Sequence, residues 1–200
     1  MVNYLRFALA IAMAALTALS AQVSFKIGVV PYTMQNFGVM LSAFLLGRYA
    51  AVAMLIYVGM IAVGLPVASG GGGIAVLFGP TSGYIYGFVV AAYLAGLLKE
   101  RVSGSAVKLW IVAAVASVPI YAMGFAVLYA YTSLDPNVLQ RLEVFASKLG
   151  FDVSGPLLVF LTGVAIFVPQ DLFVDHVAAV AAYLYIRRLL VERGIELDKR

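Results

Sequence analysis

The sequence predicts an all-α integral membrane protein, a six-transmembrane-helix bundle with a glycine-rich outer loop between helices 3 and 4. Of the 200 residues, 64% are hydrophobic and 11% are charged, whereas a soluble domain is about 45–50% apolar and about 25% charged. The apolar residues form long runs separated by short links. Because one helix needs about 20 apolar residues to cross a bilayer, a chain of this length has room for about six spans.

The composition also restricts the chemistry. The chain has no cysteine, which excludes disulfides, cysteine-ligated zinc and cysteine nucleophiles. A single histidine, His176, excludes a multi-histidine metal site. We therefore expect no catalytic residues, metal ligands or cofactor. The net charge of +4 does not indicate nucleic acid, because the basic residues lie at the ends of the apolar runs, as is ordinary for membrane proteins.

The first three spans precede the glycine loop. We place span 1 at about Tyr4–Ser24, span 2 at Thr33–Gly47 and span 3 at Tyr49–Leu65. The N-terminus has an alternative interpretation as a cleaved signal peptide, since Arg6 precedes an apolar run and residues 18–20 resemble a cleavage site. The apolar run is longer than the usual signal-peptide core of about 7–15 residues, which favours a span.

The later spans follow the same reasoning. Span 4 is placed at about Thr81–Leu98 and span 5 at Leu109–Tyr131. The last apolar stretch is too long for one ordinary span, and a proline divides it. Pro156–Val168 is then too short to cross and is predicted to be a re-entrant or surface helix. Pro169–Leu190 is span 6.

Lysine and arginine predict the orientation in the cell membrane. Three of them, Lys26, Arg141 and Lys148, fall on one side of the predicted topology. The other ten fall on the opposite side: Arg6, Arg48, Lys99, Arg101, Lys108, Arg187, Arg188, Arg193, Lys199 and Arg200. The positive-inside rule then places both termini in the cytoplasm and the glycine loop outside. The chain would form one membrane domain, residues 1–190, with a short charged cytoplasmic tail, residues 191–200.

Small residues recur every four positions along span 1, at Ala10, Ala14 and Ala18. Such spacing lets membrane helices approach closely. Two interpretations stay open at this point: packing inside the protein, or a docking face for a partner helix.

The link between spans 1 and 2 carries neutral hydrogen-bonding side chains, Thr33, Gln35 and Asn36. Thr33 is a plausible N-cap of the next helix. Alternatively, these side chains bind a ligand. Gln35 can both donate and accept a hydrogen bond, which suits a neutral urea-like group.

The link between spans 3 and 4 contains four consecutive glycines. Glycine loses more conformational freedom on folding than any other residue, so such a run indicates a backbone that approaches something closely. No Gly-Lys-Ser/Thr follows, which excludes a nucleotide P-loop. Thr81 and Tyr84 add hydroxyls and a flat apolar wall, the mixture expected of a small-ligand pocket. An irregular loop packed for its own sake is the alternative. The glycines are Gly70, Gly71, Gly72 and Gly73.

Span 6 begins with Asp171, Asp175 and His176. The two carboxylates share a helix face, so either one is protonated or a cation lies between them. Charged groups at membrane depth usually face the bundle interior. Alternatively, both lie at the outer water surface and end the helix. One histidine beside two carboxylates is weak evidence for a metal.

Residues 64–100 and 31–38 resemble the BioY family, the biotin-binding S components of energy-coupling factor (ECF) vitamin transporters. That family carries a similar PVTLQTFG segment, matched here at Pro31, Thr33, Gln35, Phe37 and Gly38. Its Pro-Gly-Asp-x-x-Lys motif is matched at Pro169 and Asp171, while Gln170 replaces the glycine and Val174 the lysine. The similarity covers about residues 15–182.

The resemblance implies a protein that captures biotin at its outer face and is not an enzyme. Partners would be a transmembrane coupling (T) subunit, docked on the span 1 alanines, and two cytoplasmic ATPases. The implied substrate-binding residues are Thr33, Gln35, Gly70, Gly71, Gly72, Gly73, Thr81, Tyr84 and Asp171.

Three departures from the family pattern leave open how the protein recognises its ligand. The glycine loop is about one residue shorter, it lacks a polar side chain near Gly72, and Val174 removes a cation. Lys26, His176 or backbone amides are the expected substitutes as partners of the biotin carboxylate. Alternative functions are an S component for thiamine or riboflavin, a small proton-coupled carrier using Asp171 and Asp175, and a membrane enzyme with a metal-assisted site there.

Overall fold

The computed structural model describes residues 3–25, 28–102 and 104–194, and is almost entirely helical. Lys26 and the end of the predicted tail, residues 195–200, lie outside the described residues. The long helices are α1 (Asn3–Gln22), α2 (Gln35–Leu46), α3 (Ala50–Ala62), α5 (Ser82–Lys99), α6 (Ala106–Ala116), α7 (Val118–Leu134), α8 (Pro136–Lys148) and α11 (His176–Glu192). The short elements are β1 (Ser24–Phe25), β2 (Tyr32–Thr33), η1 (Gly47–Tyr49), α4 (Ile74–Leu77), α9 (Gly155–Phe160), η2 (Leu161–Ala165), α10 (Val168–Gln170) and η3 (Asp171–Asp175).

The predicted helical membrane architecture is confirmed. Among the described residues, five helical stretches are long and apolar enough to cross a membrane: Tyr4–Gln22, Gln35–Ala62, Ser82–Lys99, Ala106–Leu134 and Gly155–Glu192. Many large apolar side chains are exposed on these helices, as expected of a surface that faces lipid.

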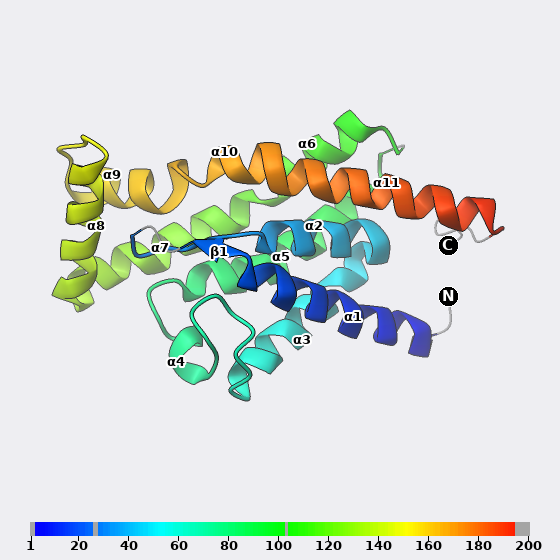
Figure 1. The fold of residues 1–200 in the computed structure, drawn as a ribbon, viewed down its shortest axis with the longest axis horizontal. Coiled ribbons are helices and arrows are strands. Elements are labelled where there is room, and N and C mark those ends of the chain that lie inside the picture. The colour runs from blue at the N-terminus through cyan, green and yellow to red at the C-terminus, as the bar shows by residue number, and fades with distance from the viewer. Residues whose placement is uncertain (1–2, 26–27, 103, 195–200) are drawn as a thin grey trace.

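The second stretch contains a chain reversal. α2 ends at Leu46 and its C-cap is Gly47, whose φ of 60° favours glycine. After η1 the chain returns through α3 (Figure 1). Residues Gln35–Ala62 therefore hold the two helices that the sequence predicted as spans 2 and 3. The total of six spans stays a prediction.

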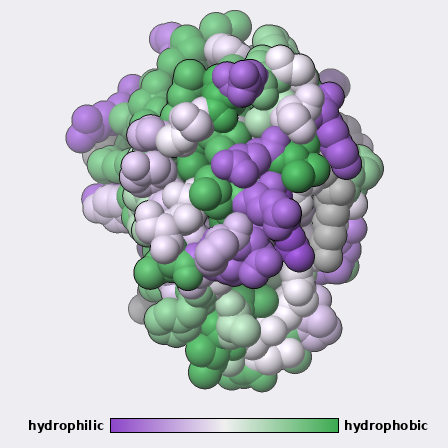
Figure 2. All heavy atoms as spheres, turned by 90° about the vertical axis from the view of Figure 1, so that its left-hand side faces the viewer, coloured by the Kyte–Doolittle hydropathy of each residue, from purple (hydrophilic) through white to green (hydrophobic). Residues whose placement is uncertain are grey.

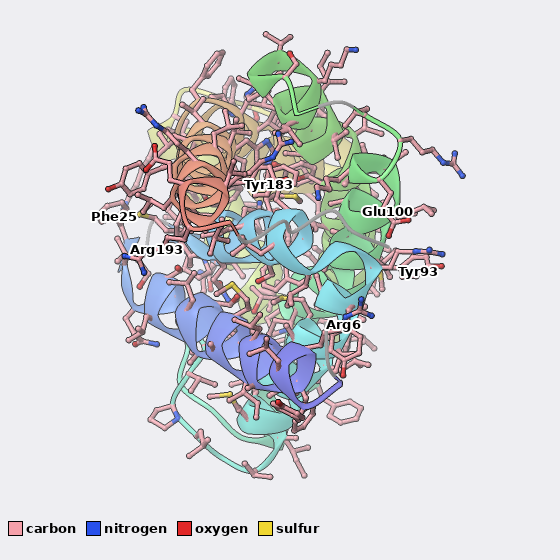
Figure 3. All side chains as sticks on the ribbon, turned by 90° about the vertical axis from the view of Figure 1, so that its right-hand side faces the viewer. Arg6, Phe25, Tyr93, Glu100, Tyr183 and Arg193 are labelled. Carbon is pink, nitrogen blue, oxygen red and sulfur yellow. The ribbon has the colours of Figure 1, made fainter. Side chains whose placement is uncertain are left out.

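Two ends of the bundle can be distinguished. The start of α1 and the end of α11 lie at one end, together with η1 (Figure 1). At this end Arg48 forms an ion pair of 3.1 Å with Glu100, and Arg6 and Glu100 are visible in Figure 3, which looks onto it. The opposite end carries the β1–β2 hairpin, the loop before α4, and α8 (Figure 1). We refer to it as the loop end.

The prediction of a re-entrant or surface helix at 156–168 is wrong. Residues Gly155–Glu192 form one helical run, and α9 continues into α10 and α11 without reversing (Figure 1). Pro169, predicted to divide the stretch, lies inside it between two π-helical segments, η2 and η3. Such π segments accommodate an irregularity without ending a helix. Trp110 Nε1 donates to the Leu172 carbonyl at 2.7 Å. This side chain therefore supplies a hydrogen bond to one backbone carbonyl of η3.

Two elements at the loop end were not expected. The link between α1 and α2 contains an antiparallel hairpin, with Ser24 opposite Thr33 and Phe25 opposite Tyr32. α8 occupies a region left without an element, between predicted span 5 and the last stretch. α8 crosses the loop end at an angle to the bundle (Figure 1).

The interpretation of Ala10, Ala14 and Ala18 as a docking face is wrong for this conformation. All three side chains are buried in the protein's own core, because α1 packs against α2 and α3. The approach is close: a Cβ at Gly38 of α2 would lie 2.7 Å from the Thr17 hydroxyl. Internal packing of small residues accounts for the pattern.

Candidate functional site

A cavity of about 350 Å³ opens at the loop end, within the range of small-molecule sites, about 300–1,000 Å³. Its walls come from the hairpin link and the start of α2, the glycine loop and α4, and from α5, α7, α8, α10 and the start of η3. Figure 2 looks onto this end and shows hydrophilic residues gathered near its centre among apolar ones. Six of the predicted binding residues line the cavity: Thr33, Gln35, Gly70, Thr81, Tyr84 and Asp171.

Asp171 is the buried anion of this cavity, with 6% of its surface exposed. Asn36 Nδ2 donates to its Oδ2 at 2.6 Å, and the Tyr121 hydroxyl donates to the same oxygen. No donor among the described residues bonds Oδ1. A buried carboxylate held rigidly through one oxygen leaves the other as a strong acceptor for a ligand N–H group.

The interpretation in which Asp171 and Asp175 end a helix at the water surface is wrong, because both are buried. Asp175 does not line the cavity. Neither of its carboxylate oxygens has a hydrogen bond of good geometry, although the Gln170 side chain and the Phe37 backbone N–H lie near them. Among the described residues no group of three or more histidine, cysteine or acidic side chains is placed to hold a metal.

Gln35 and Thr33 belong to a hydrogen-bond network beside the cavity. Met34 is the N-cap of α2, not Thr33. The Thr33 hydroxyl nevertheless accepts from the Gln35 backbone N–H at 3.3 Å, at the first residue of the helix, and donates to Gln35 Oε1 at 2.9 Å. Gln35 Nε2 donates to the Tyr57 hydroxyl at 2.7 Å, and that hydroxyl donates to the Val67 carbonyl. The network ties the hairpin link to α3 and to the glycine loop, and it leaves the second hydrogen of Nε2 for a ligand.

Aromatic side chains form a wall at the start of α5 and in the last helical run. Tyr84 lines the cavity, and its hydroxyl is held by the Gly163 carbonyl at 2.6 Å. Phe167 also lines the cavity and packs against Tyr32 with ring centroids 4.4 Å apart. Burial, and secondarily the charge of Asp171, raises the pKa of Tyr32. Its phenol therefore stays protonated and donates to the Ile166 carbonyl.

The glycine loop has folding reasons of its own, which favour the alternative interpretation of an irregular packed loop. Gly71 and Gly73 have φ of 110° and 95°, values that favour glycine. A Cβ at Gly72 would lie 2.0 Å from the Leu65 carbonyl oxygen. Of the four glycines, only Gly70 lines the cavity. The close approach inferred for this loop is therefore mainly an approach to its own backbone.

Asn36, Tyr121 and Arg141 are among the cavity residues outside the predicted binding set. Asn36 was recognised as polar, and its position one residue after Gln35 was the signal. Tyr121 lies in the apolar first half of α7, where a hydroxyl needs a partner. Arg141 is one of only three basic residues on the side predicted to be outside.

Comparison with known proteins gives the family. The BioY family pattern matches residues 2–191. The "Biotin transporter BioY" of Thermotoga maritima is 45% identical over 121 residues, which are 58% of this chain and 70% of that protein. The "Probable biotin transporter BioY" of Lysinibacillus sphaericus is 41% identical over 124 residues, 61% of this chain and, at 62%, less than two thirds of that protein.

A solved structure shares the fold. It is described as the crystal structure of the S-component for biotin from an ECF-type ABC transporter, and the two chains superpose with a TM-score of 0.70. The superposition covers 94% of each chain at 23% sequence identity. Because the family pattern spans nearly the whole sequence, this chain belongs to the BioY family.

Proposed function

We propose that this protein is the high-affinity biotin-capturing S component of an ECF-type vitamin transporter, with no catalytic activity of its own. Its family membership and the names of its relatives support the substrate. The observation that carries the proposal is Asp171, a buried carboxylate with one oxygen without a partner among the described residues, lining a cavity of small-molecule size.

The cavity chemistry matches the functional groups of biotin. The cyclic urea offers N–H groups, for which Asp171 Oδ1 is the acceptor, and a carbonyl, for which Gln35 Nε2 has a second hydrogen. The fused sulfur ring and alkyl chain need apolar walls, which Ile85, Phe88 and Ile120 provide. A mostly apolar pocket with a few placed polar groups is typical of small-ligand sites.

We further propose that the loop end faces outside the cell membrane, that both termini are cytoplasmic, and that a T subunit and two ATPases supply the energy for transport. The charge distribution supports this orientation. Uptake by the complete complex should require ATP. Uptake by this chain alone that collapses with an uncoupler would favour a proton-coupled carrier instead.

Calorimetry on the detergent-purified chain tests the proposal. We expect one-to-one binding of biotin and none of thiamine or riboflavin. Asp171→Asn should weaken biotin binding about 10- to 100-fold, because a hydrogen bond to a charged group contributes about 1.5–3 kcal/mol. The matched control is Asp152→Asn, an exposed carboxylate that does not line the cavity. Binding of another vitamin, or no difference between the two variants, would contradict the proposal.

A further inference from the structure

The charges of the cavity are few and of opposite sign. Among the described residues that line it, the charged side chains are Asp171 and Arg141. Asp171 is buried at the start of η3, whereas Arg141 is exposed on α8. The cavity therefore has a buried anion and, from a different element, a solvent-accessible cation.

Two positions considered for a cation, Val174 and His176, do not serve this cavity. Val174, at the family's lysine position, does not line it and is 49% exposed, so a side chain there points away from the ligand. His176 is fully buried and its Nε2 lies 3.0 Å from the Ser117 hydroxyl. Lys26 lies outside the described residues.

The packing of α8 fixes the place of Arg141. The Asp135 side chain caps the helix by accepting the Asn137 N–H at 2.9 Å. Val138, Leu142 and Phe145 are buried on one face, so α8 is held against the bundle while Arg141 stays at the cavity.

The hairpin link is fitted to the same helix. A Cβ at Gly28 would lie 2.8 Å from the Phe145 ring, and Gly28 itself lines the cavity. The link and α8 thus meet beside the cavity, which both Gly28 and Arg141 line.

We propose that Arg141 binds the carboxylate of the ligand at the cavity mouth, in place of the cation lost at Val174. This inference rests on the proposed function, since it concerns the acid group of biotin. The planar guanidinium can hold a carboxylate through two parallel hydrogen bonds. No described residue forms an ion pair with Arg141, so its donors are open to the ligand.

Binding of the carboxylate by Arg141 fixes the orientation of the ligand in the cavity. The urea ring would lie at Asp171 and the valerate chain would run toward α8. A ligand reversed in the cavity would set its carboxylate against Asp171, which like-charge repulsion disfavours. Arg141 would therefore select acids over neutral analogues of the same shape.

The test compares biotin with biotin amide, which keeps the urea ring and loses the acid. We expect the unmodified chain to prefer the acid by about 10- to 100-fold. Arg141→Gln should lower biotin affinity to the level of the amide and leave amide binding unchanged. The control Lys148→Gln, on the same helix but outside this cavity, should keep the acid preference. Thermal unfolding should be equal for both variants, since both side chains are exposed.

The outcomes separate the two proposals. An acid preference that persists in Arg141→Gln, or is absent from the unmodified chain, overturns the role of Arg141 while biotin capture stands. Failure of the unmodified chain to bind either biotin or its amide overturns the proposed function itself.

Discussion

At the residue scale, the site depends on how one carboxylate is held. Asn36 and Tyr121 both donate to Oδ2 of Asp171, one from α2 and one from α7. These donors fix the side-chain rotamer and compensate for burial of a polar group. The oxygen presented to the ligand is therefore oriented before binding, which lowers the entropy lost on association.

This arrangement predicts that Tyr121→Phe weakens biotin binding without removing any direct ligand contact that we propose. The expected loss is about 2- to 10-fold, matching a hydrogen bond of about 0.5–1.5 kcal/mol. Calorimetry measures it. Tyr131→Phe is the control, because that hydroxyl donates to the Phe78 carbonyl and not to Asp171. Equal affinities for the two variants would show that Tyr121 does not position Asp171.

At the element scale, the glycine loop and α8 frame the cavity by different means. The loop is shaped by backbone contacts that no side chain permits, such as Gly72 against the Leu65 carbonyl. α8 is held by an N-cap and a buried apolar face. Each element should therefore respond differently to a small substitution.

In the glycine loop, we expect Gly72→Ala to lower stability and Gly70→Ala to weaken ligand binding. The first forces a Cβ to within 2.0 Å of a carbonyl oxygen and should lower stability by about 1–3 kcal/mol. The second meets nothing within 4 Å, so stability should hold while the added methyl narrows the cavity and weakens binding. Thermal unfolding followed by the single Trp110 measures the first effect and calorimetry the second. Equal Tm values for the two variants would refute this account.

In α8, Asp135→Ala should destabilise the first turn by about 1 kcal/mol, the usual contribution of an N-cap. Amide hydrogen exchange in α8 should then be about five-fold faster. Glu143→Ala, an exposed change in the same helix, should leave exchange unchanged. Unaltered exchange in Asp135→Ala would mean that tertiary packing alone holds the helix.

At the scale of the whole molecule, the two ends of the bundle have different roles. One end gathers the start of α1, the end of α11 and the Arg48–Glu100 ion pair, and the other carries the cavity (Figure 1). Between them the surface is largely apolar. Because the two ends of the bundle differ, labelling one residue at each end tests the proposed orientation directly.

The absence of cysteine allows that test with single-cysteine variants in intact cells. Asp152→Cys, at the loop end, should react with a membrane-impermeant maleimide from outside. Arg193→Cys, just beyond α11, should react only after the membrane is opened. The reverse labelling pattern would invert the proposed topology and place the cavity on the cytoplasmic side.

The sequence by itself determined the helical membrane class and the approximate positions of the apolar helices, because both follow from hydrophobic runs of membrane length. It also identified six cavity residues, from Thr33 to Asp171. These residues lie in a link or at the starts of predicted spans, where polar residues and glycines interrupt the apolar runs.

Only the tertiary structure decided which polar groups meet. Asn36, Tyr121 and Asp171 come from three helices far apart in sequence, and no local pattern encodes their contact. The same holds for Ala10, Ala14 and Ala18, whose spacing fits inward and outward packing equally. Arg141 lines the cavity because α8 crosses the loop end (Figure 1), and that placement depends on non-local packing rather than on the periodicity of any one segment.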